Sequence, residues 1–550
     1  MTTCNSCGGN LKPLAKFCSQ CGTKVGDTAN AVGTGSAVSA ARRLQVSASA
    51  RTAIGSTLFV LPSRFVGELT RLLDQHVASP LGMVADADPA QLQIKARQAF
   101  KRHHATGSLK YVCLLGNWSE VAPFRVADPI QERHSEIFCL TDALYGCTEE
   151  YDEDDIFTAI PSVPVGRIPV LDADVVAAAL LEAPRQLDPA QAFAFGVSAK
   201  CWSLPTQAII RLFTDTTSKA TLVVEPQNSA LTAPGVLSSP GWDSDDLQRA
   251  VSQDSLDAGA VVLFNVHGSG EVTGWYGQAR TMGPCEPMIM TPDTIGQFNS
   301  AVMISEACHG GAMGYDEPSI VERFFTNGGK AFVGSSGRAY GITNHDWDGD
   351  EKLCAADLIA LHFLKALRQG KTMGEALTLA KLETHTNDPR LAPTAKKSAL
   401  SFNLYGAPWH SLKKAAAATV MPESENRGSM LDRIRSRRSG DVEDPSDSMA
   451  DLRQRYRSKL PENYRRFMLE RNDALRRISG FQDLNVVEAL LADWDVSLED
   501  CDLESIDMGD DFGFVLIGES NKHSGPKQLF QMVMDSAGAV KKILTSKGRP

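Results

Sequence analysis

Long apolar runs are absent from this chain of 550 residues, and so is an excess of positive charge. No uninterrupted apolar stretch approaches the roughly 18 residues that a membrane-spanning helix needs. The first ten residues contain neither the basic nor the apolar segment of a secretory signal. With 55 Lys and Arg residues against 66 Asp and Glu residues, the net charge is −11, which argues against coating nucleic acid or an anionic membrane through bulk charge. We therefore expect a globular, cytoplasmic protein with no membrane partner.

A disulfide framework is also missing. Most of the 12 cysteines are scattered between residues 113 and 501, which is typical of free thiols in a reducing compartment. The others form two Cys-x-x-Cys pairs near the N-terminus, at Cys4, Cys7, Cys18 and Cys21. Four thiolates in this spacing suit a tetrahedral Zn²⁺ ion, and the glycine after each pair permits a tight turn. The segment resembles the zinc ribbons at the ends of many multidomain prokaryotic proteins, which predicts a structural zinc site.

Residues 1–25 are too few to bury a hydrophobic core, so metal binding would supply their folding energy. A redox role is the alternative for a single Cys-x-x-Cys motif, but two matched pairs disfavour it. A module of this size is expected to dock a partner, either a protein or a nucleic acid, with a protein favoured.

The rest of the chain divides by composition. Residues 26–55 are rich in Gly, Ser and Ala and predict a flexible linker. Between residues 56 and 413, apolar strand-length runs alternate with helical patterns, which indicates an α/β fold with a parallel-rich sheet. Residues 414–448 carry opposite charge blocks and form a second linker. Residues 449–550 predict a small α+β domain of unknown family, with three strands between 513 and 544.

Two apolar strands end in reactive side chains that are followed by glycine. The first ends at His267-Gly268-Ser-Gly, and the second ends at Glu306-Ala-Cys308-His309-Gly-Gly. Chemistry in parallel sheets lies at the carboxyl ends of strands, and a cysteine near a histidine is the minimum set for nucleophilic acyl transfer. Taken singly, each residue has a plainer interpretation, as a buried thiol or as a structural histidine. Together they predict a catalytic pair.

These two segments resemble the clan of caspase-like cysteine peptidases, which includes caspases, metacaspases, legumain and gingipains. Further segments resemble the gingipain family in particular. They follow in the expected order over residues 56–413, as Tyr111-Val-Cys-Leu-Leu-Gly116, Thr141-Asp142-Ala-Leu-Tyr145-Gly146, Val165-Gly-Arg167-Ile-Pro169 and Asn403-Leu-Tyr405-Gly406-Ala407-Pro408.

The resemblance implies a caspase-like α/β sandwich, with parallel-rich sheets in an N-terminal subdomain (56–190) and a catalytic subdomain (191–413). It implies that Cys308 is the nucleophile of a cysteine endopeptidase and that His267 is the general acid/base. The backbone N–H groups of Gly268 and Cys308 would bind the oxyanion, whereas His309 is expected to point away from the thiol. Two positions depart from the family pattern, since Lys200 and Ala407 stand where acids are usual.

Substrate preference is predicted from two acidic residues. Residues two apart on a strand face the same way, so Glu306 lies on the side of Cys308 and would pair with an Arg or Lys side chain before the cleaved bond. Asp346 is a second candidate, because lysine-selective gingipains resemble the stretch around it. The alternatives are that Asp346 belongs to a solvated acidic loop and that Arg338 neutralises the pocket.

The leading hypothesis is an intracellular cysteine endopeptidase that acts on protein substrates. Its own specificity would permit self-processing after Arg437 or Arg438 in the basic linker segment 433–438, although an ordinary charged tether explains that segment equally well. The acidic stretches 149–155 and 346–350 raise a Ca²⁺ requirement only weakly. The alternative function is a catalytically silent scaffold that binds protein or nucleic acid through its zinc ribbon, which Lys200 and Ala407 would favour.

Overall fold

The structure is a computed structural model. It describes two compact units, Met1–Leu44 and Gln45–Pro550. The described residues are 2–3, 10–11, 48–76, 79–130, 137–153, 155–182, 193–214, 222–224, 235–238, 260–270, 274–277, 288–295, 302–314, 317–344, 353–387, 392–412, 502–507, 512–519, 529–535, 540–546 and 548–549. In the first unit, β1 (Thr2–Thr3) pairs antiparallel with β2 (Asn10–Leu11).

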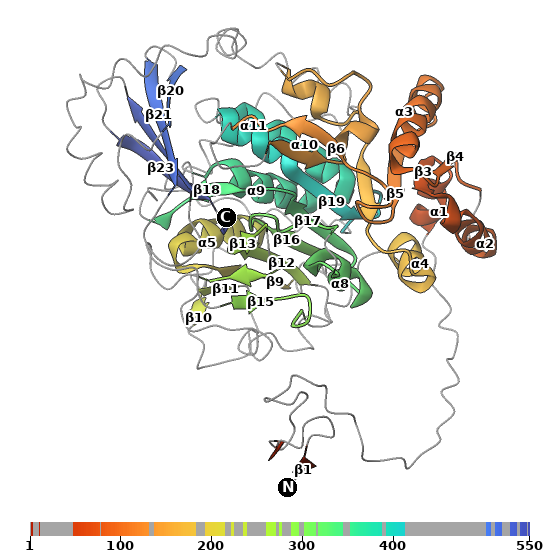
Figure 1. Cartoon of the computed structure of the whole chain (residues 1–550), viewed down its shortest axis with the longest axis horizontal. Coiled ribbons are helices and arrows are strands. Elements are labelled where there is room, and N and C mark those ends of the chain that lie inside the picture. The colour runs from red at the N-terminus through yellow and green to blue at the C-terminus, as the bar shows by residue number, and fades with distance from the viewer. Residues whose placement is uncertain are drawn as a thin grey trace, which may run out of the picture. The chain divides into compact units, whose positions relative to one another are not determined.

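A single sheet of eleven strands forms the centre of the second unit (Figure 1). Its spatial order is β10-β11-β9-β12-β16-β17-β19-β8-β5-β3-β4. All neighbours in this order are parallel except β17 and β19. The strands are β3 (Thr57–Pro62), β4 (Gly82–Asp86), β5 (Tyr111–Leu115), β8 (Val165–Ile168), β9 (Phe193–Ser198), β10 (Leu222–Val224), β11 (Gly235–Ser238), β12 (Ala260–Asn265), β16 (Val302–Ser305), β17 (Ala331–Ser335) and β19 (Phe402–Gly406).

The expected α/β class is confirmed, but the sheet is continuous where separate sheets in two subdomains were predicted. Strands from residues 57–168 and strands from residues 193–406 meet where β19 pairs with β8, with Tyr405 opposite Arg167. This pairing joins positions that are more than 200 residues apart in the sequence. A local apolar pattern carries no information on such a pairing, which is why the sequence did not predict it.

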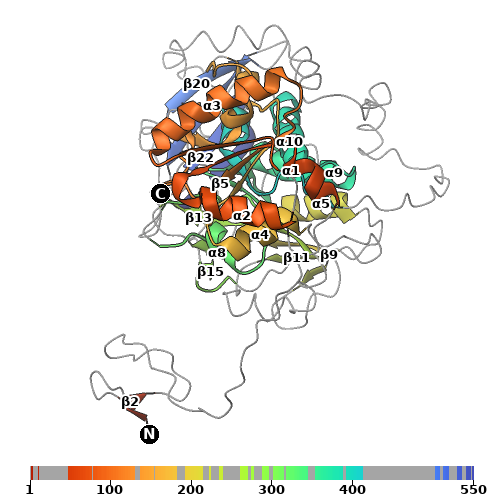
Figure 2. The same ribbon diagram turned by 90° about the vertical axis from the view of Figure 1, so that its right-hand side faces the viewer.

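Helices cover the sheet because its strands bury both faces. One face packs against α3 (Pro89–Ala105), α9 (Ala355–Arg368), α10 (Met373–Asn387) and α11 (Ala392–Ser401), through alternate strand residues such as Leu58, Val60, Leu263 and Ile304. A second group of helices, which contact one another through α4, lies on the other side (Figure 2): α1 (Ala48–Ile54), α2 (Val66–His76), α4 (Ala173–Leu181) and α8 (Ile320–Thr326). The helix α5 (Ser203–Thr214) packs beside β9 and α9.

Side-chain caps fix where several helices begin. The Asp88 side chain accepts a hydrogen bond from the Ala90 amide, and Pro89 occupies the first turn of α3. At α8, Ser319 and Glu322 form a capping box in which each side chain accepts from the other's amide.

Smaller sheets complete the described part of the second unit. The hairpin β6 (Phe124–Ala127) and β7 (Phe138–Thr141) is one. Another has the order β15-β14-β13-β24, with β13 (His267–Ser269), β14 (Trp275–Tyr276), β15 (Met288–Met290) and β24 (Gly548–Arg549). A third has the order β18-β23-β22-β21-β20, with β18 (Tyr340–Ile342), β20 (Asp502–Asp507), β21 (Phe512–Glu519), β22 (Leu529–Asp535) and β23 (Val540–Ser546).

The C-terminal segment therefore contains the three expected strands and two more, β20 and β24. Two of its strands pair with the core, since β23 pairs with β18 and β24 pairs with β13. The helical pattern expected over residues 451–493 lies outside the described residues, as do both predicted linkers apart from the segment 48–55.

Candidate active site

The two strand ends singled out in the sequence lie side by side. Strands β12 and β16 are parallel neighbours, with Phe264 opposite Ser305. His267 and Cys308 each follow this matched pair by three residues, so they lie at the same carboxyl edge of the sheet. The Glu306 amide continues the ladder by donating to the Phe264 carbonyl oxygen at 2.8 Å.

The Cys308 thiol is fully buried and held by the main chain of Ala339. Its Sγ atom accepts a hydrogen bond from the Ala339 amide at 3.1 Å and lies 3.4 Å from the Ala339 carbonyl oxygen. Ala339 directly precedes β18. Cys308 is therefore tied to an element about 30 positions further along the chain, which brings the start of β18 to its sulfur atom.

The imidazole of His267 packs against an indole ring. The ring centroids of His267 and Trp202 are 4.5 Å apart, and both side chains are fully buried. Lys200, at the position where the family usually has an acid, has an exposed side chain. Trp202 thus limits how the imidazole can rotate. This contact could not be predicted from the sequence, because a lone tryptophan fits any core.

Gly268 lies so close to the nucleophile that no side chain fits there. A Cβ atom at position 268 would overlap the carbonyl oxygen of Cys308 and press against the Ala307 methyl group. The main chains of the two strand ends are therefore in contact. This is the close approach that the proposed oxyanion site needs, because its two N–H donors, on Gly268 and Cys308, come from these neighbouring segments.

The turn after Cys308 is fixed at three points. The His309 amide donates to the Gly337 carbonyl oxygen at 2.8 Å, and the Gly311 amide donates to the Ser335 carbonyl oxygen at 2.7 Å. The Tyr405 hydroxyl donates to the Gly311 carbonyl oxygen. These contacts connect the nucleophile turn to β17 and β19.

His309 itself has a φ of 53°, a left-handed conformation that is uncommon outside glycine and is found at functional turns. Its partly exposed ring lies against Gly270, and it lines a small cavity together with Ser269 and Cys308. The sequence predicts that His309 points away from the thiol, whereas in the structure His309 and Cys308 line the same cavity.

The two predicted specificity residues have different outcomes. Glu306 is fully buried, two positions before the nucleophile. Arg338, the cation considered as its neutraliser, is also buried. Asp346 lies outside the described residues, so its proposed role stays a prediction.

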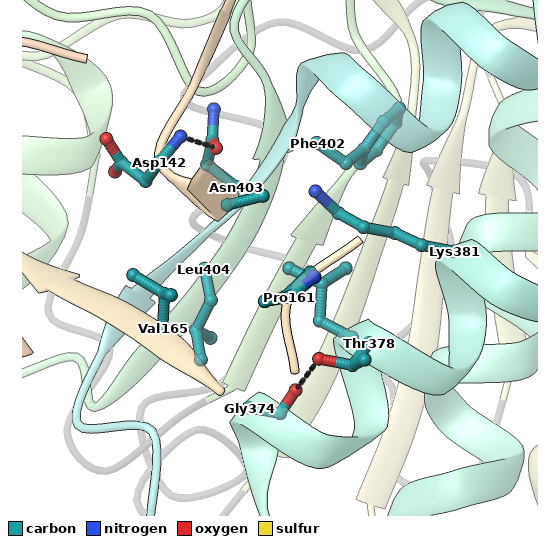
Figure 3. A pocket seen from close by; sticks show the side chains of 11 residues that line it. Asp142, Pro161, Val165, Gly374, Thr378, Lys381, Phe402, Asn403 and Leu404 are labelled. Atoms are coloured by element: carbon teal, nitrogen blue, oxygen red, sulfur yellow. Dashed lines mark hydrogen bonds between the residues drawn. The ribbon is translucent and has the colours of Figure 1, made fainter. Parts of the chain in front are cut away.

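The other motif residues meet at the junction of the sheet, away from the catalytic pair. Arg167 on β8 binds both carboxylate oxygens of Asp142, at 2.7 and 2.6 Å, and also donates to the carbonyl oxygens of Gly116 and Val121. The Asp142 amide donates to the Asn403 side chain at 2.9 Å (Figure 3). These motifs therefore join the two halves of the sheet.

A small pocket beside this junction is lined by Asp142, Asn403 and Lys381 of α10, among others, and its lining includes neither Cys308 nor His267 (Figure 3). Burial lowers the pKa of Lys381 to about 8. The pocket therefore belongs to the junction of the sheet and is separate from the residues of the candidate active site.

The predicted metal ligands cannot be placed. Cys4, Cys7, Cys18 and Cys21 lie outside the described residues, although the paired strands β1 and β2 bracket Cys4 and Cys7 in the sequence. Within the described ranges, no group of three or more His, Cys, Asp or Glu side chains could hold a metal ion. In the acidic stretch 149–155, Glu150 pairs with Lys101 at 2.5 Å and Asp155 caps a short helical turn. None of the helices in the described part of the chain is long and apolar enough to cross a membrane.

Comparison with known proteins gives one family. The model of peptidase family C25 matches residues 57–184 and 202–413, which is more than half of the chain. No curated protein matches. Three solved structures are similar at 12% identity. The complex of Porphyromonas gingivalis RgpB pro- and mature domains has a TM-score of 0.45 and covers 66% of this chain and 80% of that one.

The Arg-specific cysteine proteinase gingipain R has a TM-score of 0.45, with 66% and 79% of the two chains covered. A protein described as a protease has a TM-score of 0.41, with 67% and 82% covered. At this level of similarity the assignment depends on the family match alone. That match spans the strand ends that carry His267 and Cys308 and all four junction motifs, and the chain belongs to peptidase family C25, a family of cysteine peptidases.

Proposed function

We propose that this cysteine peptidase is an endopeptidase that cleaves proteins after Arg or Lys, with Cys308 as nucleophile and His267 as general acid/base. The observation that carries the proposal is the matched register of β12 and β16, because it delivers both side chains to one edge of the sheet. Peptidases act on protein substrates, and an extended peptide could lie beside β18 at this edge of the sheet.

The reaction follows from the groups present. His267 takes the proton of the Cys308 thiol, and the thiolate attacks the carbonyl carbon of the scissile bond. The N–H groups of Gly268 and Cys308 stabilise the negative charge on the carbonyl oxygen. The imidazolium then returns the proton to the departing amine, leaving an acyl-enzyme thioester. A water molecule, deprotonated by His267, hydrolyses the thioester and restores the thiol.

The basic specificity rests on Glu306. A carboxylate in a buried environment is strongly stabilised by a cationic partner, and Arg or Lys in the substrate would supply that charge. Asp346 is the second candidate for this role. Glu306→Gln keeps the shape and removes the charge, so it should lower kcat/KM for basic substrates by about 10²-fold, the cost of about 3 kcal/mol.

The experiment is covalent labelling with a peptidyl-Arg chloromethyl ketone, mapped by mass spectrometry. Wild type should be labelled at Cys308, and Cys308→Ala should not be labelled. Cys354→Ala is the matched control, since Cys354 is an equally buried thiol in the same core and its loss should leave labelling unchanged. Cleavage profiles dominated by Asp or Asn before the scissile bond would contradict the basic specificity.

The zinc ribbon is proposed to tether the peptidase, in the cytoplasm, to a docking partner that is a protein rather than a nucleic acid. Matched Cys-x-x-Cys pairs support the metal, and the pairing of β1 with β2 around the first pair supports a compact knuckle. Metal analysis of the purified chain should find one Zn²⁺ that is lost when Cys4 and Cys7 are replaced by Ser. Activity that survives a calcium chelator would argue against a Ca²⁺ requirement.

Self-processing after Arg437 or Arg438 is proposed as a way to separate the C-terminal segment from the core. The basic residues of the linker match the proposed specificity. Intact mass should show cleavage for wild type and none for Cys308→Ala. Full-length mass for both chains would reject this step.

A further inference from the structure

Two strands of the chain's own C-terminal segment lie on the edges that flank the catalytic pair. Strand β23 pairs antiparallel with β18, with Ser546 opposite Tyr340 (Figure 1). Strand β24 pairs parallel with β13, with Gly548 opposite Gly268. The C-terminal segment is therefore joined by main-chain pairing to both sides of the site.

Each of these edges belongs to a reacting group. β18 begins directly after Ala339, whose main chain holds the Cys308 thiol, and β13 begins with His267. Only one residue separates β23 from β24 in the sequence. The chain therefore passes from the edge of β18, next to Cys308, to the edge of β13, next to His267, over a length of a few ångströms.

The burial of the catalytic side chains agrees with an occupied site. Cys308, His267 and Glu306 each have an exposed fraction of 0%. A nucleophile and its general base must touch the substrate, so a peptide can reach them only if something moves. The sequence of the segment is also that of a substrate, because the residue that joins β23 to β24 is Lys547, a residue of the type proposed for the specificity position.

We propose that β23 and β24 occupy the substrate groove of the chain's own peptidase site and keep it closed until they are displaced. Extended segments commonly bind by adding a strand to an exposed sheet edge, where main-chain hydrogen bonds supply most of the affinity. Here the added strands are covalently part of the enzyme, so they compete with substrate at a high effective concentration. This proposal rests on the proposed function in one respect, namely that the groove beside Cys308 and His267 binds the peptide substrate.

The test measures access to the thiol separately from catalysis. Iodoacetamide alkylation is followed at Cys308 by peptide mass mapping, for wild type and for the chain ended at Ser546, which lacks β24. Removal of β24 should speed alkylation of Cys308 at least tenfold and leave alkylation of buried Cys354 unchanged. Arg549→Ala is the matched control. It alters a side chain of β24 but keeps the main-chain pairing, so its rate should stay within twofold of wild type.

Two further measurements keep the test decisive. A synthetic peptide of residues 547–550, which contains β24, added in excess to the shortened chain, should restore slow alkylation. In wild type, amide hydrogen exchange at residues 268–269 and 340–342 should be slow, and removal of β24 should speed it at residues 268–269 while residues 302–305 of β16 remain protected.

An unchanged alkylation rate in a shortened chain whose β16 remains protected would overturn the proposal. So would fast exchange of both flanking strands in wild type, a result that requires no variant. Because alkylation needs no turnover, faster alkylation without peptide hydrolysis would support the closed groove and reject the peptidase assignment of the site. If wild type and the shortened chain hydrolyse peptides at the same rate and are alkylated at the same rate, the peptidase assignment is supported and the closed groove is rejected.

Discussion

At the scale of single residues, Trp202 is a side chain that packs against His267. Its indole lies 4.5 Å from the imidazole, centroid to centroid. Packing restricts the ring without changing its charge. A packed imidazole still needs the correct angle to reach the thiol, so catalysis should be sensitive to the volume at position 202.

We predict that Trp202→Ala lowers kcat/KM by about 10²-fold, because a reacting group displaced by about 1 Å costs that much. Trp202→Phe, which keeps an aromatic wall, should recover most of the loss. The measurement is kcat/KM together with its dependence on pH. Equal activities of the Ala and Phe variants would show that the indole does not position the histidine.

Gly268 supplies a sharper steric prediction. Gly268→Ala places a methyl group on the Cys308 carbonyl oxygen, so it should abolish chloromethyl-ketone labelling and lower the free energy of unfolding by about 1–3 kcal/mol. Gly67→Ala is the matched control, because nothing lies within 4 Å of a Cβ atom there and α2 should tolerate or gain from it. A fully labelled Gly268→Ala variant would contradict the close approach.

The neighbouring strand ends that carry His267 and Cys308 could be located from the sequence because their signal is local, whereas their catalytic roles stay a prediction. Each residue ends an apolar strand and is followed by glycine, a pattern visible within ten residues. The contacts of Trp202, Ala339 and Tyr405 could not be predicted in the same way. They come from segments far away in the chain, and their residue types fit many structural positions.

At the scale of elements, the sheet depends on one buried ion pair at its junction. Arg167 and Asp142 are both almost fully buried, and Arg167 also satisfies carbonyl groups after β5. Burial is the largest single effect and lowers the pKa of Arg167, but the charge and the hydrogen bonds of Asp142 outweigh it together with smaller contributions from Tyr145 and Tyr405, so the pKa is raised above its ordinary value. Loss of one partner would leave the other charged group without compensation in the core.

Arg167→Met is therefore expected to lower the free energy of unfolding by about 3–5 kcal/mol. Combining it with Asp142→Asn should recover a substantial part, since the buried negative charge is then removed as well. Denaturant unfolding of the single and double variants checks this. Arg71→Met, which breaks an exposed pair with Glu68 on α2, is the control and should cost less than about 1 kcal/mol.

Strand positions were predicted well where an apolar run defined them, as for β5, β12, β16 and β17. The strand β24 was not predicted. It has two residues, Gly548 and Arg549, and neither its length nor its composition differs from a loop. It is a strand because β13 offers an edge, and that is a property of the folded core rather than of the segment.

At the scale of the whole molecule, buried histidines should make stability depend on pH. Burial lowers the pKa of His410 to about 4 and that of His385 to about 3, from 6.5. Below pH 6.5 the unfolded chain binds protons that the folded chain does not. The free energy of unfolding should thus fall as the pH falls from 7 to about 4, and the contribution of His410 should then level off.

We predict that His410→Gln removes about 2–3 kcal/mol of this loss between pH 7 and pH 4.5, because each pH unit between 6.5 and the lowered pKa of His410 contributes about 1.4 kcal/mol. The glutamine amide can still reach the Ala179 carbonyl oxygen, which lies 2.8 Å from the His410 Nε2 atom. Denaturant unfolding at pH 7 and at pH 4.5 measures the difference. The control is His103→Gln, at a partly exposed position. If the wild-type and His410→Gln curves run parallel, the buried imidazole does not titrate as described.

The position of β19 has a consequence for biosynthesis. This strand is the last of the core strands to be made, yet it lies in the interior of the sheet, between β17 and β8. Until residue 406 has left the ribosome, the two halves of the sheet cannot join, and the Tyr405 hydroxyl cannot secure the turn that carries Cys308. Domains generally fold as units during synthesis. The turn that carries Cys308 is therefore made before the strand that secures it, so the candidate active site can be completed only after β19 has been synthesised.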